Sequence, residues 1–243
     1  MRTIAYPTIA VAALIGAALL VVAFAGSPDV TKPTDSNAPE LAKPSEAKPT
    51  EAVDDAKLRK ATFASGCFWC TEAVYDQLKG VKSVVSGYTG GLLLEPTYEQ
   101  VCSGTTGHAE AIQVTYDPAE ISFEDLLRVF WQTHDPTTLN RQGHDVGTQY
   151  RSAIFYHDDE QRKIAEQYKR QLDASKVFRS PIVTEITAYE TFYPAEQDHQ
   201  NYFELNPNQS YCSLVIRPKV EKFQKEFKDL LRDEARKSAP NPR

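Results

Sequence analysis

Residues 60–91 read KATFASGCFWCTEAVYDQLKGVKSVVSGYTGG and contain three successive secondary-structure elements. Residues 60–64 have the composition of a short strand. The apolar positions between 68 and 78 recur at helical spacing, and Gly80 follows them as a helix terminator. The β-branched run 81–89 predicts a second strand, which Gly90-Gly91 closes. The stretch therefore predicts a strand–helix–strand unit.

The chain after residue 91 continues this alternation. Residues 108–116 predict a third strand, 122–134 an amphipathic helix capped by Ser122, and 151–156 a fourth strand. Strand, helix, strand, strand, helix, strand is the order of the split β-α-β unit in ferredoxin-like folds. Further elements are expected at 159–174 (helix), 182–189 (strand) and 220–230 (a helix on the surface). We expect an α/β (α+β) fold with a ferredoxin-like core, a mixed or antiparallel sheet and additional C-terminal helices.

The N-terminal part of the chain differs from this folded part. Residues 9–25 are apolar, Arg2 is the only charge before Asp29, and the small-x-small triplet Ala23-Phe24-Ala25 ends the stretch. This pattern predicts a signal peptide over 1–25. An uncleaved N-terminal membrane anchor is the alternative, because the apolar stretch could nearly span a bilayer. Both interpretations place the protein outside the cytoplasm, in the periplasm or another extracytoplasmic location.

Residues 26–57 are rich in Pro, Thr, Ala, Lys and Glu and contain no aromatic residue. Such a composition cannot bury enough apolar surface to offset the entropy of ordering. We expect a disordered linker here, used as a spacer or as a partner-binding segment, followed by one catalytic domain over 58–243.

The overall composition argues against binding to nucleic acid or anionic lipid, and its Cys and Met content suggests redox chemistry. A formal charge of −6 offers no basic surface for nucleic acid or anionic lipid. Cys occurs four times, at 67, 70, 102 and 212, whereas Met occurs only at position 1. A domain without Met suits an oxidising environment, since oxidation makes that side chain polar.

Cys67 and Cys70 form a Cys-x-x-Cys motif between the first strand and the first helix. A thiol at a helix N-terminus is favoured as the reactive thiolate, and Cys70 lies one turn further on, where it could trap an oxidised Cys67. Phe68 and Trp69 form an apolar wall beside it. A buried structural pair is the alternative. A metal site is disfavoured because no second Cys-x-x-Cys completes a tetrahedral set.

Glu110 lies on a strand that is otherwise largely apolar, on the same face as His108 and Ile112. Desolvation raises the pKa of a carboxyl group in such surroundings and suits it to donate a proton. The alternative is a carboxylate paired with an arginine such as Arg151.

Several blocks of this sequence resemble the peptide methionine sulfoxide reductases of the A type. They include Gly-Cys-Phe-Trp at 66–69 and Ser-Gly-Tyr-Thr-Gly-Gly at 86–91. Similar blocks occur at 96–104, 106–110, 130–131, 134–136, 145–152 and 195–200. The resemblance runs in order from about residue 60 to residue 215.

The resemblance implies that Cys67 attacks the sulfur of methionine-S-sulfoxide, free or in an oxidised protein, and becomes a sulfenic acid. It implies that Glu110, helped by Tyr98 and Tyr150, binds and protonates the sulfoxide oxygen.

The resemblance also implies residues that bind the rest of the substrate. Phe68 and Trp69 would hold the methyl group, with Asp145 on the polar side and His199 as a further binding residue. No metal or organic cofactor is implied, and we expect a monomer.

The sulfenic acid must then be resolved by a second thiol. Cys70 is favoured because the loop to Cys67 is so short. Cys212 is the alternative, since it resembles a C-terminal resolving position, although the glycine-rich tail that usually follows is absent. Cys102 is expected to be a buried thiol. An exported thioredoxin-like reductant would regenerate the enzyme.

Two other functions remain open from the residues. A dithiol–disulfide oxidoreductase would use the same motif but would be indifferent to Glu110→Gln. A cysteine hydrolase would pair Cys67 with His108 or His199 and would need no reductant.

Overall fold

The computed structural model describes residues 57–238. The predicted signal peptide or anchor at 1–25 and, except for Lys57, the predicted linker at 26–57 lie outside the described residues, as do positions 239–243. Within 57–238, no helix combines the length and apolar character that a membrane crossing requires.

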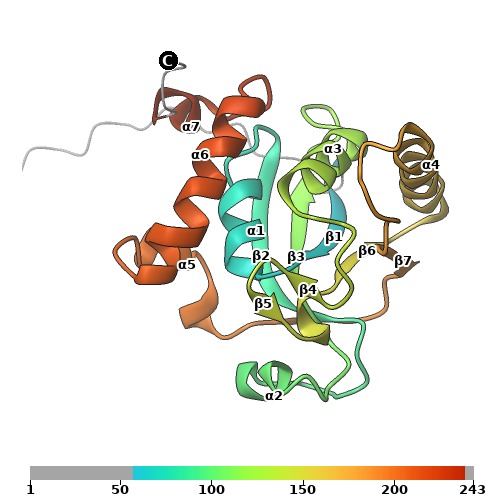
Figure 1. Cartoon of the computed structure of the whole chain (residues 1–243). Coiled ribbons are helices and arrows are strands. Elements are labelled where there is room, and N and C mark those ends of the chain that lie inside the picture. Colours follow the sequence, from blue (N-terminus) through green and yellow to red (C-terminus); the bar gives the residue numbers. More distant parts are fainter. Residues whose placement is uncertain (1–56, 239–243) are drawn as a thin grey trace, which may run out of the picture. The chain divides into compact units, whose positions relative to one another are not determined.

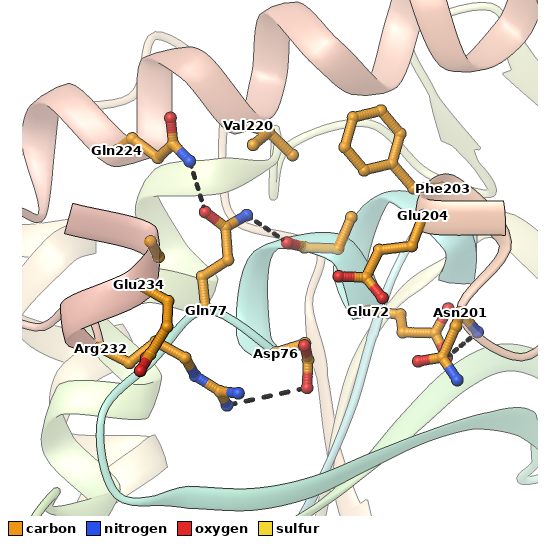
Figure 2. A pocket seen from close by; sticks show the side chains of 12 residues that line it. Glu72, Asp76, Gln77, Asn201, Phe203, Glu204, Val220, Gln224, Arg232 and Glu234 are labelled. Carbon is orange, nitrogen blue, oxygen red and sulfur yellow. Dashed lines mark hydrogen bonds and ion pairs between the residues drawn. The ribbon is translucent and has the colours of Figure 1, made fainter. Parts of the chain in front are cut away.

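A six-stranded mixed sheet forms the centre of the fold (Figure 1). Its strands are β1 (Arg59–Ser65), β2 (Val81–Thr89), β3 (Ala109–Tyr116), β6 (Ser152–Tyr156), β7 (Glu185–Ala188) and β8 (Phe192–Pro194). Their order is β7-β6-β1-β3-β2-β8, and all neighbours are antiparallel except β6 and β7. β3 lies between β1 and β2, which helix α1 (Phe68–Tyr75) connects. This is the predicted split β-α-β arrangement, with β7 and β8 added at the two edges.

Seven α-helices and a small hairpin surround the sheet within the described residues. Besides α1 they are α2 (Tyr98–Cys102), α3 (Phe123–Thr133), α4 (Asp159–Ser175), α5 (Tyr202–Leu205), α6 (Arg217–Glu226) and α7 (Asp233–Ser238); the hairpin pairs β4 (Arg141–Gln142) with β5 (Asp145–Val146). The helix predicted to residue 78 is α1, which ends at Tyr75, and the C-terminal helix predicted to residue 230 is α6, which ends at Glu226. The predicted strand 182–189 is shortened to β7.

The two faces of the sheet are covered differently. On one face, Phe63 of β1 packs against the rings of Tyr75, Phe123 and Phe130 at centroid distances of 5.5, 6.0 and 5.4 Å. The other face is built mainly of alanines, and the partly buried Tyr189 and Phe192 pack on it. These small side chains leave room for the segment that connects β7 to β8 at the opposite edge.

The C-terminal elements hold the far end of α1. Leu78 and Leu231 form an isolated antiparallel bridge. On either side of it, Lys79 N–H donates to the carbonyl of Leu230 at 2.8 Å, and Arg232 N–H donates to that of Gln77 at 2.9 Å. Helix α6 lies alongside α1 (Figure 1). We call residues 77–79 with 230–232 the C-terminal latch.

Candidate active site

The junction between β1 and α1 requires a glycine. Gly66 has φ of +90°, and a Cβ at this position would lie 2.5 Å from the Cβ of Gln142. Left-handed backbone and close approach of the β4–β5 hairpin together exclude larger residues. The turn makes Cys67 the N-cap of α1, so the structure places this thiol where the sequence predicted.

Cys67 and Cys70 line a small cleft. Their residues are 6% and 1% exposed, and both are free thiols. The cleft has a volume of about 180 Å³. Its walls are formed by Cys67, Cys70, Gln142, Gly143, His144, Asp145, Tyr211, Val215 and Lys219.

The two thiols titrate as a pair because they share a hydrogen bond. Burial, reinforced by that hydrogen bond, raises the pKa of the Cys67 thiol. The hydrogen bond to Cys67 and, against the effect of burial, the charge of Lys219 lower the pKa of the Cys70 thiol to about 7. The pair can therefore lose one proton near neutral pH, and these opposite shifts place the resulting charge on Cys70 rather than on Cys67, where the sequence predicted the thiolate.

Glu110 is 1% exposed, and its Oε2 accepts a hydrogen bond of 3.1 Å from the backbone N–H of Phe68. Burial raises its pKa to about 8, although the hydrogen bond from Phe68 opposes the shift. The carboxyl group is therefore protonated at neutral pH, as a proton donor must be. The alternative pairing is wrong: Arg151 binds Glu185 at 3.2 Å, not Glu110.

Tyr98 and Tyr150 keep their protons beside Glu110. Tyr98 begins α2, and Tyr150 ends a short 3-10 segment that follows β5. Burial, and then the charge of Glu110 among other groups, raises the pKa of both hydroxyls. Tyr98 also hydrogen-bonds Cys102, which is half-buried rather than buried as expected. The structure thus brings together one protonated carboxyl group and two protonated phenol hydroxyls.

Aromatic side chains form the apolar part of the site. Phe68 is 1% exposed and lies 6.3 Å from the Tyr98 ring, while Trp69 lies 6.2 Å from it. His199 joins this cluster at 4.2 Å from Tyr98. Tyr202 of α5 stacks on Trp69 at 3.8 Å with an interplanar angle of 9°. Tyr202 was not predicted from the sequence, because a four-residue helix shows no periodicity.

Asp145 holds a tyrosine over the thiols. The Tyr211 hydroxyl donates to Asp145 Oδ2 at 2.7 Å and lies 4.0 Å from Cys70 Sγ. Tyr211 was also missed, and its place beside Cys212 in the sequence is the only signal that could have indicated it. Cys212 itself is fully buried in the π-helical segment Cys212–Ile216 and does not line the cleft.

Within the described residues, neither His108 nor His199, the two histidines considered for a hydrolase, is hydrogen-bonded to Cys67. His108 is occupied by backbone groups: its Nδ1 accepts from Gly91 N–H at 3.1 Å, and its Nε2 lies 2.7 Å from the carbonyl oxygen of Leu93. His199 packs among the aromatic rings. Among residues 57–238, no three His, Cys, Asp or Glu side chains gather in a way that could hold a metal ion.

Comparison with known proteins relates this site to a family. Residues 59–231 match the family described as peptide methionine sulfoxide reductase. The chain is 55% identical over 174 residues to the MsrA of Polynucleobacter asymbioticus, covering 72% of this chain and 92% of that protein. It is 54% identical over 176 residues to the MsrA of Chromobacterium violaceum, covering 72% of this chain and 100% of the other.

Solved structures give the same result. The reduced form of Mxr1 from Saccharomyces cerevisiae is 37% identical with a TM-score of 0.60, covering 65% of this chain and 91% of that one. Methionine sulfoxide reductase A of Corynebacterium diphtheriae is 35% identical with a TM-score of 0.56, covering 63% and 77% of the two chains.

Proposed function

Since this chain belongs to the peptide methionine sulfoxide reductase family, we propose that it reduces methionine-S-sulfoxide, free or in oxidised proteins, through Cys67. The observation that carries this proposal is the pairing of a thiol with a buried, protonated carboxyl group. Glu110 binds the N–H of Phe68, the residue next to Cys67, and its pKa is raised to about 8.

The first half of the reaction transfers oxygen from one sulfur to another. Glu110, with Tyr98 and Tyr150, hydrogen-bonds the sulfoxide oxygen and donates a proton to it, which makes the substrate sulfur electrophilic. Cys67 attacks that sulfur as a thiolate. The substrate sulfur is reduced by two electrons and leaves as methionine, while Cys67 is oxidised by two electrons to the sulfenic acid. Phe68 and Trp69 hold the methyl group, and Asp145 and His199 bind the rest of the substrate.

The second half restores the thiol. Cys70 attacks the sulfenic sulfur of Cys67 and forms a disulfide. The hydrogen bond that already joins Cys67 and Cys70 favours this thiol over Cys212, which does not line the cleft. A thioredoxin-type dithiol then reduces the disulfide by exchange.

We place this reaction outside the cytoplasm. The apolar stretch 9–25 after Arg2 supports export, with residues 26–57 as a spacer between the leader or anchor and the catalytic domain. Cell fractionation with an antibody to the catalytic domain tests the location, and recovery in the cytoplasm would contradict it.

The purified full-length chain tests the proposed activity. Incubation with dithiothreitol and each epimer of N-acetylmethionine sulfoxide should yield methionine from the S epimer only. The Cys67→Ser variant should form none, because it lacks the nucleophile. If a well-folded chain with a free Cys67 reduced neither epimer, the proposed function would be wrong.

A further inference from the structure

Lys219 stands out among the residues that line the cleft of Cys67 and Cys70. It lies on the first turns of α6 and is partly buried. It makes no hydrogen bond or ion pair with any residue in the described range 57–238. Lys222, one turn further along α6, pairs with Glu226 at 3.8 Å. A partly buried lysine that faces two thiols without an acidic partner needs an explanation, because desolvating an unpaired charge is costly.

The carboxylate of the cleft wall does not provide that partner. Asp145 is the acidic side chain among the lining residues, and its Oδ2 is bound by the hydroxyl of Tyr211 at 2.7 Å. Lys219 therefore needs another anion in the cleft as its partner, and a thiolate of the cysteine pair can provide that negative charge. Among the groups on which Lys219 acts electrostatically is Cys70.

We propose that Lys219 stabilises the Cys70 thiolate while that thiolate attacks the oxidised Cys67, which makes it a positioning residue for the resolving step. The inference rests on the proposed function, since it presupposes the sulfenic acid. In this step the Cys70 sulfur forms the S–S bond as the S–O bond of Cys67 breaks. The oxygen leaves as hydroxide and takes up the proton that Cys70 released to solvent, giving water.

Other groups around Cys70 do not supply the same charge. The titratable groups that surround Cys70 or line its cleft are Cys67, Tyr211, Asp145, Glu110, Cys212 and His144. Asp145 disfavours a thiolate at Cys70, and the Tyr211 hydroxyl and the Cys67 thiol favour it through hydrogen bonds. Lys219, in contrast, adds a positive charge beside Cys70 that does not depend on the state of Cys67. Its contribution therefore remains when oxidation of Cys67 removes the thiol–thiol hydrogen bond.

Single-turnover kinetics of the full chain test this assignment. The reduced protein is freed of reductant, mixed with the S epimer and quenched over time. Methionine and the Cys67–Cys70 disulfide are quantified separately by mass spectrometry between pH 6.5 and 9. In Lys219→Met, methionine should form at the natural rate. Disulfide formation should slow about fivefold at pH 7 and recover at pH 9, since loss of a nearby cation raises a thiol pKa by about one unit.

Two variants serve as controls. Lys219→Arg should restore the natural rate and pH profile of disulfide formation. Lys225→Met removes an exposed lysine from the same helix and should leave both steps unchanged. An unaltered pH profile in Lys219→Met, slowing that persists at pH 9, or a disulfide from Cys67 to Cys212 would overturn the proposal. Failure of the natural chain to release methionine would instead contradict the proposed function.

Discussion

At the scale of single residues, two glutamates beside the same tyrosine have opposite protonation. Burial raises the pKa of Glu110 to about 8. For Glu196, burial acts in the same direction but is outweighed by hydrogen bonds from its own backbone, from Tyr98 N–H and from the Tyr88 hydroxyl, so its pKa is lowered. Glu196 thus remains an anion that positions α2 and Tyr98, whereas Glu110 keeps a proton to donate.

Glu110→Gln should slow the first turnover about 100-fold or more, because an amide can hydrogen-bond the sulfoxide oxygen but cannot protonate it. The pKa of Glu110 is raised, so its donor form is present at neutral pH and is lost as pH rises through about 8. In the natural protein the rate of methionine formation should therefore fall above that pH. The variant should lack this alkaline decline. Glu120→Gln, on the surface, is the matched control, and an alkaline decline that survives in Glu110→Gln would contradict the assignment.

At the scale of elements, the two main helices of the core begin differently. Helix α3 has a complete capping box between Ser122 and Asp125. Helix α1 has no side-chain cap on Cys67 and no acidic residue in its first turn. Instead, the carboxyl group of Glu110, from β3, accepts from the N–H of Phe68. Because no side chain of its own caps the helix, the backbone N–H groups at this end are available to the reacting groups.

Gly66→Ala tests how strictly the strand–helix junction holds Cys67. The added Cβ would sit at φ of +90° and 2.5 Å from Gln142 Cβ. We expect a loss of about 2–4 kcal/mol in the free energy of unfolding by urea, together with a slower first turnover. Gly143→Ala is the matched control. It also has positive φ, of +62°, but nothing within 4 Å, and should lose only about 1 kcal/mol. Equal losses in both variants would show that the contact with Gln142 is unimportant.

The sequence predicted the elements that are long enough to show a period. Helices α3 and α4 were found in this way, whereas the core strands were predicted mainly from their composition and from the residues that bound them. β8 and α5 have three and four residues, too few for any periodicity, and both were missed. Cys67 and Glu110 could be predicted because motif and strand position indicate their chemistry. Tyr211 and Lys219 could not, because the packing of the π-helical segment Cys212–Ile216 and of α6 on α1 places them at the thiols, and no local pattern encodes that packing.

At the scale of the whole molecule, α1 lies between the sheet and the C-terminal elements. Val220 and Phe223 of α6 are buried on the same core as Phe63. The C-terminal latch fixes the end of α1 opposite to Cys67. The position of the thiols therefore depends on residues at both ends of the domain.

Leu231→Ala should weaken the latch. The natural side chain is 1% exposed, and its truncation leaves a cavity that should cost about 2–5 kcal/mol. Urea unfolding measures the loss. Leu205→Ala makes the same chemical change at a position that is 69% exposed and should change the unfolding free energy by about 0.5 kcal/mol or less. A Leu231→Ala protein as stable as the control would show that the latch does not support the fold.

The latch also has a consequence for synthesis on the ribosome. Gln77 and Lys79 emerge early, but their partners Leu230 and Arg232 are translated only at the end of the domain. A chain that pauses before Leu230 has both thiols but lacks the contacts that secure the helix beneath them. The reactive pair is thus completed by the last part of the domain to be made, and a partly translated chain holds its thiols less firmly than the finished one.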